Sequence, residues 1–82
     1  MTTVLVEYQH DLPLSDDELA VRVAKLRPCF EVREIKWLHA YLSFDRKTQF
    51  AVFEAVDAET VRTVHGMLGV AFVRIVPTTV VV

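Results

Sequence analysis

Four short segments rich in β-branched and aromatic residues alternate with two helical segments, and their order limits the folds that the chain can adopt. The four segments are residues 3–9, 34–44, 48–55 and 70–76. Their composition predicts β-strands. The polar residues 45–47 join the second strand to the third and predict a hairpin. Pro77 after the fourth strand favours an edge position for that strand.

The first helical segment carries a start signal and a stop signal. Ser15 is followed three residues later by Glu18, which is the spacing of a capping box. Apolar side chains then recur at helical spacing and predict a buried face, formed by Leu19, Val23 and Leu26. Pro28 is expected to end the helix, because the residue before a proline is driven out of the helical region. Cys29 is then expected in the turn that follows, as a structural residue.

The second helical segment begins after Asp57, a favourable N-cap residue. Its apolar stripe follows the spacing i, i+3, i+4 and i+7 and consists of Val61, Val64, His65 and Leu68. This places His65 at the edge of the core. Either Gly66 or Gly69 is expected to end the helix.

The order βαββαβ predicts a ferredoxin-like fold of the α+β class. We expect one domain over residues 1–82, since the chain is too short for a second. Its antiparallel sheet has the strand order 4-1-3-2, with the first and third strands side by side and, from right-handed crossovers, parallel to each other. Both helices cover one face of the sheet, so the other face is left open.

Composition and charge exclude several functional classes. A hydrophobic content of 52% with 24% charged residues excludes a disordered chain. Nine basic against eleven acidic residues give a net charge of −2 without a basic cluster, so nucleic-acid binding is not expected. Neither a membrane-spanning segment nor a signal peptide is predicted. The single cysteine cannot form an internal disulfide, and a cytoplasmic location is expected.

Strand alternation assigns side chains to the two faces of the sheet. In the second strand, one set consists of Trp37, His39, Tyr41 and Ser43, and the other of Leu38, Ala40 and Leu42. We expect the first set on the open face and the second under the helices. Glu7 is also expected on the open face, because a carboxylate under the helices would need a buried partner. The alternation leaves the faces of Ala51 and Glu54 undecided.

An open face of this composition predicts contact with a second copy of the chain. Leu5, Trp37, Tyr41 and Phe53 would make it apolar, and exposed apolar patches commonly mark interfaces. We therefore expect a symmetric homodimer in which the two open faces meet. The polar groups of His39, Tyr41 and Glu7 would then be enclosed between the subunits.

His39 is the leading candidate for a functional group. Its imidazole could bind a metal or transfer a proton; the alternative is a histidine that is hydrogen-bonded at a dimer interface. A two-fold axis can bring two such imidazoles together, and two imidazoles with oxygen ligands suit nickel, copper or zinc. Glu7 could be a ligand or a general base, or a half-buried carboxylate bonded to Tyr41 or a backbone amide. One strand separates Glu7 from His39, which places their backbones about 10 Å apart.

Other polar residues are weaker candidates. His10 and Asp11, at the end of the first strand, could bind a metal near the rim of the sheet or could belong to a solvated loop. Glu54 could join either site or form a salt bridge. The sequence contains no glycine-rich phosphate loop, nucleophile elbow or Cys-x-x-Cys motif.

Residues 35–55, IKWLHAYLSFDRKTQFAVFEA, resemble a family of small bacterial proteins of unknown function, some of which are described as nickel-binding. The most specific part is the motif WLHAY, residues 37–41, and Val6-Glu7 matches the first strand of the family. The resemblance implies a ferredoxin-like homodimer that binds nickel, with Glu7, His39 and Tyr41 at the matching positions.

The chain departs from the family pattern in three places. Ala51 stands where the family often has cysteine, and Val56 where it often has proline. Val64 occupies the usual position of a histidine, and His65 follows one residue later. A metal site that used those family positions would be weaker or differently built here.

Three functional hypotheses follow. In the first, a cytoplasmic homodimer binds nickel(II) for sequestration or homeostasis, with His39, Glu7, Tyr41, His10 and Asp11 as candidate ligands and water completing six-coordination. In the second, a cofactor-free isomerase or oxygenase uses His39 as acid and base and Tyr41 as a donor to an oxyanion. The third is a module whose open face only dimerises.

Overall fold

Six elements follow one another in the predicted order. The computed structural model describes residues 1–79 and 81–82 of the 82-residue chain. The elements are β1 (Thr2–Gln9), α1 (Asp16–Glu31), β2 (Lys36–Leu42), β3 (Thr48–Ala55), α2 (Ala58–Leu68) and β4 (Arg74–Thr78). This confirms the βαββαβ arrangement. Val80, part of the C-terminal valine run, lies outside the described residues.

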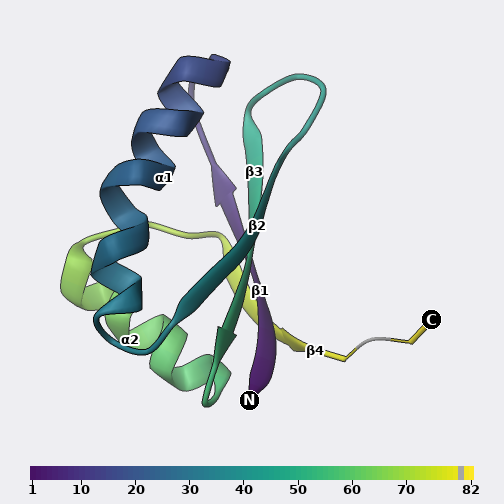
Figure 1. Ribbon diagram of the computed structural model, residues 1–82. Coiled ribbons are helices and arrows are strands. Elements are labelled where there is room, and N and C mark those ends of the chain that lie inside the picture. Colours follow the sequence, from purple (N-terminus) through teal and green to yellow (C-terminus); the bar gives the residue numbers. More distant parts are fainter. Residues whose placement is uncertain (80) are drawn as a thin grey trace.

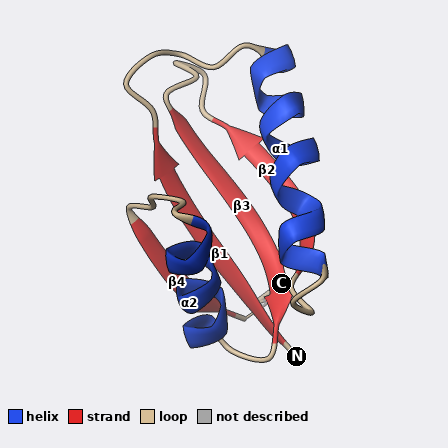
Figure 2. Cartoon of the chain, turned by 90° about the vertical axis from the view of Figure 1, so that its left-hand side faces the viewer, coloured by secondary structure: helices blue, strands red, loops and turns tan. Residues whose placement is uncertain are grey.

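The four strands form one sheet in the order β2-β3-β1-β4, which is the predicted order 4-1-3-2 viewed from the other edge. β1 pairs with β3 and with β4, and β2 pairs with β3, all antiparallel. The expectation that the first and third strands run parallel is wrong. The crossover through α1 makes β2 parallel to β1, and the hairpin then reverses the direction of β3. Both helices lie on one side of the sheet, and no helix covers the other (Figures 1 and 2).

α1 begins at its predicted cap and runs past its predicted end. The Ser15 hydroxyl accepts from the Glu18 amide at 3.0 Å, and the Ser15 amide donates to the Glu18 carboxylate at 3.1 Å, as in a capping box. Pro28 does not end the helix, which continues to Glu31 and contains Cys29. A proline inside a helix costs about 3 kcal/mol, but here the last turn carries Phe30 into the core with no exposed surface. Burial of that side chain contributes about 1.5–3 kcal/mol in return.

α2 is bounded by Asp57 and Gly69. The Asp57 carboxylate accepts from the Thr60 amide at 2.7 Å, which pairs one of the free N–H groups of the first turn. Gly69 has a φ of 68°, the left-handed conformation that ends a helix and favours glycine. Gly66 lies inside the helix, so Gly69 is the stop.

The same substitution at these two glycines is expected to have opposite effects. Gly69→Ala should lower the free energy of unfolding by about 1 kcal/mol, because a Cβ is unfavourable at positive φ. Gly66→Ala should raise it by about 0.5–1 kcal/mol, because alanine loses less backbone entropy in a helix. An added Cβ meets no atom within 4 Å at either position, so backbone conformation alone decides the sign. Urea unfolding of both variants measures the difference, and equal effects would contradict the assignment of the helix end.

β4 occupies an edge of the sheet, as Pro77 predicts, but with other bounds than expected. It begins at Arg74 and includes Pro77, which lies opposite Val4. Residues 70–73 instead connect α2 to the sheet, where the Val73 amide donates to the Glu7 carbonyl at 2.7 Å. Because β4 pairs only with β1 among the described residues, the proline does not interrupt a ladder between two strands.

An irregularity in β2 reverses part of the predicted alternation. The register with β3 shifts between Trp37, opposite Phe53, and His39, opposite Val52. The extra residue, Leu38, places Trp37 and His39 on opposite faces, as a β-bulge does. Trp37 is therefore buried under the helices, opposite Phe53, which the regular alternation of β3 places on the same side. The prediction that both lie on the open face is wrong.

The core lies between the sheet and the helices and is centred on an aromatic cluster. The Phe30 ring lies 4.9 Å from the Phe53 ring, 4.9 Å from the His65 ring and 5.9 Å from the Trp37 ring, measured between centroids. Aromatic pairs at these separations stabilise a core beyond the area that they bury. Phe30, from the last turn of α1, thereby joins that helix to β2, β3 and α2.

Candidate functional site

The open face of the sheet consists of side chains in rows that cross all four strands. The strand registers define two central rows. From β2 to β4, one row is Tyr41, Phe50, Glu7 and Arg74, and the other is His39, Val52, Leu5 and Val76. Five of these eight side chains are apolar or aromatic; of the ionisable groups, His39 and Arg74 lie on the edge strands and Glu7 on the central strand β1.

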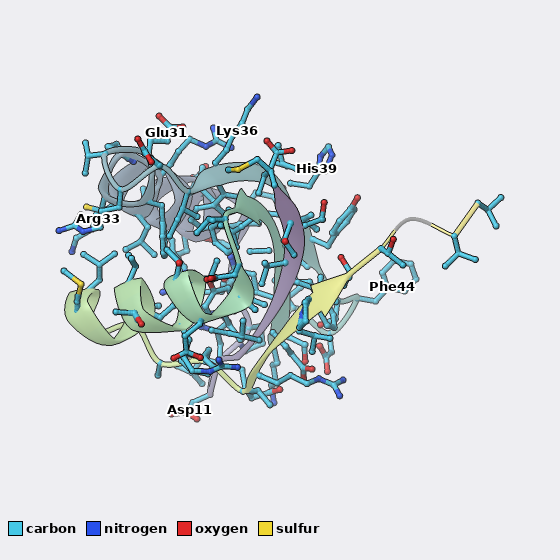
Figure 3. All side chains as sticks on the ribbon, turned by 90° about the horizontal axis from the view of Figure 1, so that it is seen from below. Asp11, Glu31, Arg33, Lys36, His39 and Phe44 are labelled. Atoms are coloured by element: carbon cyan, nitrogen blue, oxygen red, sulfur yellow. The ribbon has the colours of Figure 1, made fainter. Side chains whose placement is uncertain are left out.

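His39 projects from the uncovered side of the sheet, as predicted. Its side chain points away from the helices (Figure 3) and is exposed. The imidazole centroid lies 6.2 Å from the Tyr41 ring centroid, and Tyr41 is 57% exposed. The His39 side chain makes no hydrogen bond with any residue that the structure describes. Both of its ring nitrogens are therefore accessible to a ligand or a second protein surface.

Glu7 lies on the open face, as predicted, but with a different partner. Its carboxylate accepts from the Arg74 Nε at 2.8 Å, and its side chain is 18% exposed against 69% for Arg74. Phe50 separates Glu7 from Tyr41 in their row. Glu54 also lies on this face, because its neighbours Phe53 and Ala55 are buried beneath the helices. The pair with Arg74 leaves the second carboxylate oxygen of Glu7 free to act as a ligand.

His10 and Asp11 lie away from these groups. The His10 Nε2 is 3.1 Å from the Gln49 Oε1, and Gln49 is buried on the helix side of the sheet. Asp11 is exposed in the following loop, at the opposite edge of the molecule from His39 (Figure 3). The structure thus divides the five predicted ligands into two groups, with Glu7, His39 and Tyr41 on the open face.

A single chain does not assemble a complete metal site from its described residues. Residues 1–79 and 81–82 contain no group of three histidine, cysteine or carboxylate side chains close enough to hold one ion. Ala51 is buried under the helices and so does not open space between Glu7 and His39. Nickel-type sites with nitrogen and oxygen ligands need more donors than His39 alone supplies. Further ligands would have to come from water or from another chain.

A second histidine, His65, is buried in a polar network under the helices. Its Nδ1 donates to the Val61 carbonyl at 2.7 Å, and the Tyr8 hydroxyl lies 2.6 Å from its Nε2. A carbonyl oxygen only accepts, so the neutral ring carries its proton on Nδ1 and accepts from Tyr8 at Nε2. Burial lowers the pKa of His65 and raises the pKa of Tyr8 above its ordinary value. The His65 side chain has no exposed surface, so it lies inside the core and not at the predicted edge.

Arg22 and Gln49 extend this network and were not singled out from the sequence. The Arg22 Nε donates to the Gln49 Oε1 at 3.0 Å, and the guanidinium carbon lies 5.0 Å from the centroid of the Tyr8 ring. Tyr8 could have been assigned to the helix side from its alternation with Glu7. The approach of Arg22 depends on how α1 is placed over the sheet, for which the sequence carries no local signal.

Among the described residues, no helix is both long and apolar enough to cross a membrane.

Comparisons with known proteins give a family match and a structural match. The model of the family described as "Nickel responsive protein SCO4226-like" matches residues 6–78. The crystal structure of SCO4226 from Streptomyces coelicolor A3(2) is similar, with a TM-score of 0.79 and 17% sequence identity over 98% of this chain and 99% of that chain. At this level of identity the likeness supports the fold. A search of curated proteins gave no match.

Proposed function

Since this chain belongs to the SCO4226-like family of nickel responsive proteins, we propose that it binds nickel(II) on the open face of its sheet. The match covers residues 6–78, and it confirms the family resemblance that the WLHAY motif indicated. The observation that carries the proposal is the position of His39, an accessible imidazole on a face that no helix covers. Imidazole is a common ligand of nickel.

The open face supports a second copy of the chain as the source of further ligands. Its central side chains are apolar, and Tyr41 and Val76 are 57% and 39% exposed. A contiguous apolar surface on a small protein favours association, and a two-fold axis would place identical groups from both chains opposite each other. We propose a homodimer in which His39 from both chains, with Glu7, Tyr41 or water, completes the coordination of nickel.

Calorimetric titration of the tag-free protein with nickel(II) tests the role of His39. The wild-type protein is expected to bind nickel, and His39→Ala is expected to weaken binding at least about tenfold, or 1.4 kcal/mol, because it removes an imidazole ligand. The matched control is His10→Ala. His10 lies on the helix side against Gln49, so this variant should keep the wild-type affinity.

The mass in solution, measured on the same three proteins, separates the alternatives. If His39→Ala loses nickel binding and keeps the mass of the dimer, His39 is supported as a ligand of the metal. If His39→Ala changes the mass in solution but not the affinity for nickel, the open face is a dimerisation surface that holds no metal. Equal nickel affinity in wild type and His39→Ala, or no binding by either, would refute the proposal.

A further inference from the structure

A groove lies on the helix side of the sheet, opposite the face that carries His39. It runs between α1 and the segment that joins α2 to β4, where the two helices leave part of β1 uncovered (Figure 2). Its volume is about 760 Å³, within the range of sites for small organic molecules. Leu26 of α1, Leu68 at the end of α2 and Val70 of the α2–β4 segment give it apolar walls. The space is therefore suited to the apolar body of a small ligand.

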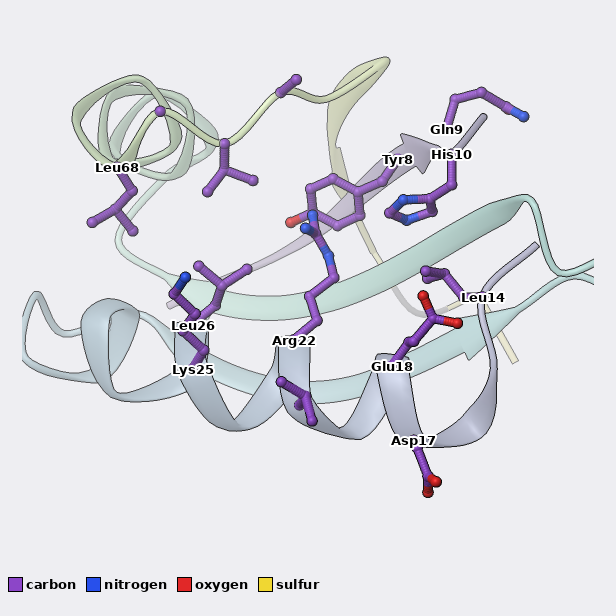
Figure 4. Close-up of a pocket in the computed structure, with 14 residues that line it drawn as sticks. Tyr8, Gln9, His10, Leu14, Asp17, Glu18, Arg22, Lys25, Leu26 and Leu68 are labelled. Atoms are coloured by element: carbon purple, nitrogen blue, oxygen red, sulfur yellow. The ribbon is translucent and has the colours of Figure 1, made fainter. Parts of the chain in front are cut away.

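The floor of the groove presents a cation in a fixed position. Arg22 reaches from α1 toward Tyr8 and His10 (Figure 4). Two contacts hold its guanidinium in place. The Nε donates a hydrogen bond to the Gln49 Oε1, and the group lies against the Tyr8 ring. When the hydrogen bond is made by Nε, the two terminal nitrogens of the guanidinium can still donate to the two oxygens of a carboxylate.

Arg22 has no carboxylate partner of its own in the part of the chain that the structure describes. The ion pairs found there involve Arg46, Arg62 and Arg74. Glu18, one turn before Arg22, accepts from the Ser15 amide in the capping box instead. The positive charge at the floor of the groove is therefore available to an anionic ligand.

Gln49 positions two of the side chains that line the groove. It is fully buried, and its amide oxygen accepts from both Arg22 and His10, two residues that line the groove. Its amide nitrogen has no acceptor among the described residues. A buried donor without a partner is unfavourable. Gln49 itself is not among the residues that line the groove, so it serves the site by holding Arg22 and His10 through its amide oxygen.

We propose that this groove binds a small organic monocarboxylate. The carboxylate contacts the terminal nitrogens of Arg22 beside His10, and the apolar body lies against Leu26 and Leu68. Asp17 and Glu18 line the end of the groove near the start of α1 and disfavour a second negative charge at that end, while Lys25 lines the groove one turn of α1 after Arg22. The site is independent of the nickel proposal, since it lies on the other side of the sheet.

Titration of the metal-free protein with sodium octanoate, followed by amide chemical shifts, tests this site. Octanoate is expected to shift the amides of residues 8–10, 22–26 and 68–71, and octanamide, which has the same chain without the charge, should bind at least about tenfold more weakly. Arg22→Gln should lose at least the same factor. Arg27→Gln, which removes an exposed arginine of α1 outside the groove, should bind as wild type does.

The comparison of octanoate with octanamide on the wild-type protein keeps the test valid if Arg22→Gln unfolds. Equal affinity for the two probes would overturn the proposal. Absence of saturable binding in the millimolar range, or shifts centred on Leu5 and Val52 of the open face, would overturn it as well. None of these outcomes depends on nickel, so failure here leaves the nickel proposal intact.

Discussion

Replacing Phe30 with alanine is expected to lower the free energy of unfolding by about 3–5 kcal/mol, as large-to-small changes in a packed core do. Phe30 has no exposed surface and contacts the rings of Trp37, Phe53 and His65. It is the one fully buried residue of α1, so its loss also removes the main anchor of that helix. Because small domains have a total stability of about 5–15 kcal/mol, this single change should leave the protein marginally folded.

Chemical denaturation followed by tryptophan fluorescence measures this effect directly. The protein has one tryptophan, and Trp37 packs edge-on against Phe30, so its emission reports on the affected cluster. Phe44→Ala is the matched control, because Phe44 is fully exposed in the hairpin loop and its removal should change stability by less than about 0.5 kcal/mol. A loss below about 1 kcal/mol in Phe30→Ala would contradict the packing of α1 described above.

Acidification from pH 7 to pH 5 is expected to destabilise the protein through His65. The pKa of His65 is lowered by burial in the folded state, so the unfolded chain binds the proton first as the pH falls below about 6.5. Unfolding then takes up a proton, and stability falls by up to about 1.4 kcal/mol per pH unit until the folded pKa is reached. The proton would have to enter at Nε2, which would break the hydrogen bond from Tyr8.

The pH window separates this effect from that of the carboxylates. Hydrogen bonds lower the pKa values of Glu18, Asp45 and Asp57, so their stabilising effect is present above their ordinary pKa values and is lost only in stronger acid. Urea unfolding at several pH values between 5 and 7 should therefore isolate His65.

A variant without the titrating ring identifies the group. His65→Gln should remove most of the slope in this window, whatever its effect on stability at pH 7. His39→Gln removes an exposed histidine and leaves the Tyr8–His65 pair intact, so it should keep the slope. A pH dependence that is unchanged in His65→Gln would show that another group is responsible.

Local patterns were sufficient to predict the order of the elements, the starts of both helices and the bounds of β3. The capping box at Ser15 and the cap at Asp57 lie where the helices begin, because capping involves residues three apart in the chain. Glu7 was correctly placed on the open face, and Val4, Val6 and Tyr8, which alternate with it in β1, are buried on the helix side. These features depend on neighbours in sequence, so a single sequence is enough to identify them.

The errors occurred where distant contacts overrode a local preference. Pro28 was expected to end α1, but Phe30 in the following turn is held by aromatic rings from β2, β3 and α2. The predicted open face included Trp37 because a strict alternation was assumed, and the bulge before His39 reverses that alternation. A bulge at a residue such as Leu38 leaves no compositional signal, so only the pairing of β2 with β3 reveals it.

The sequence by itself determined the succession of strands and helices, the open face and the presence of His39 and Glu7 on it, because spacing along one strand or helix decides each of these. Only the tertiary structure decided that Glu7 pairs with Arg74, that His10 lies on the other side of the sheet from His39, and that Arg22 meets Tyr8 and Gln49 at the floor of a groove. The physical reason is that these contacts join residues 14 to 67 positions apart, and their energies depend on how whole elements are packed.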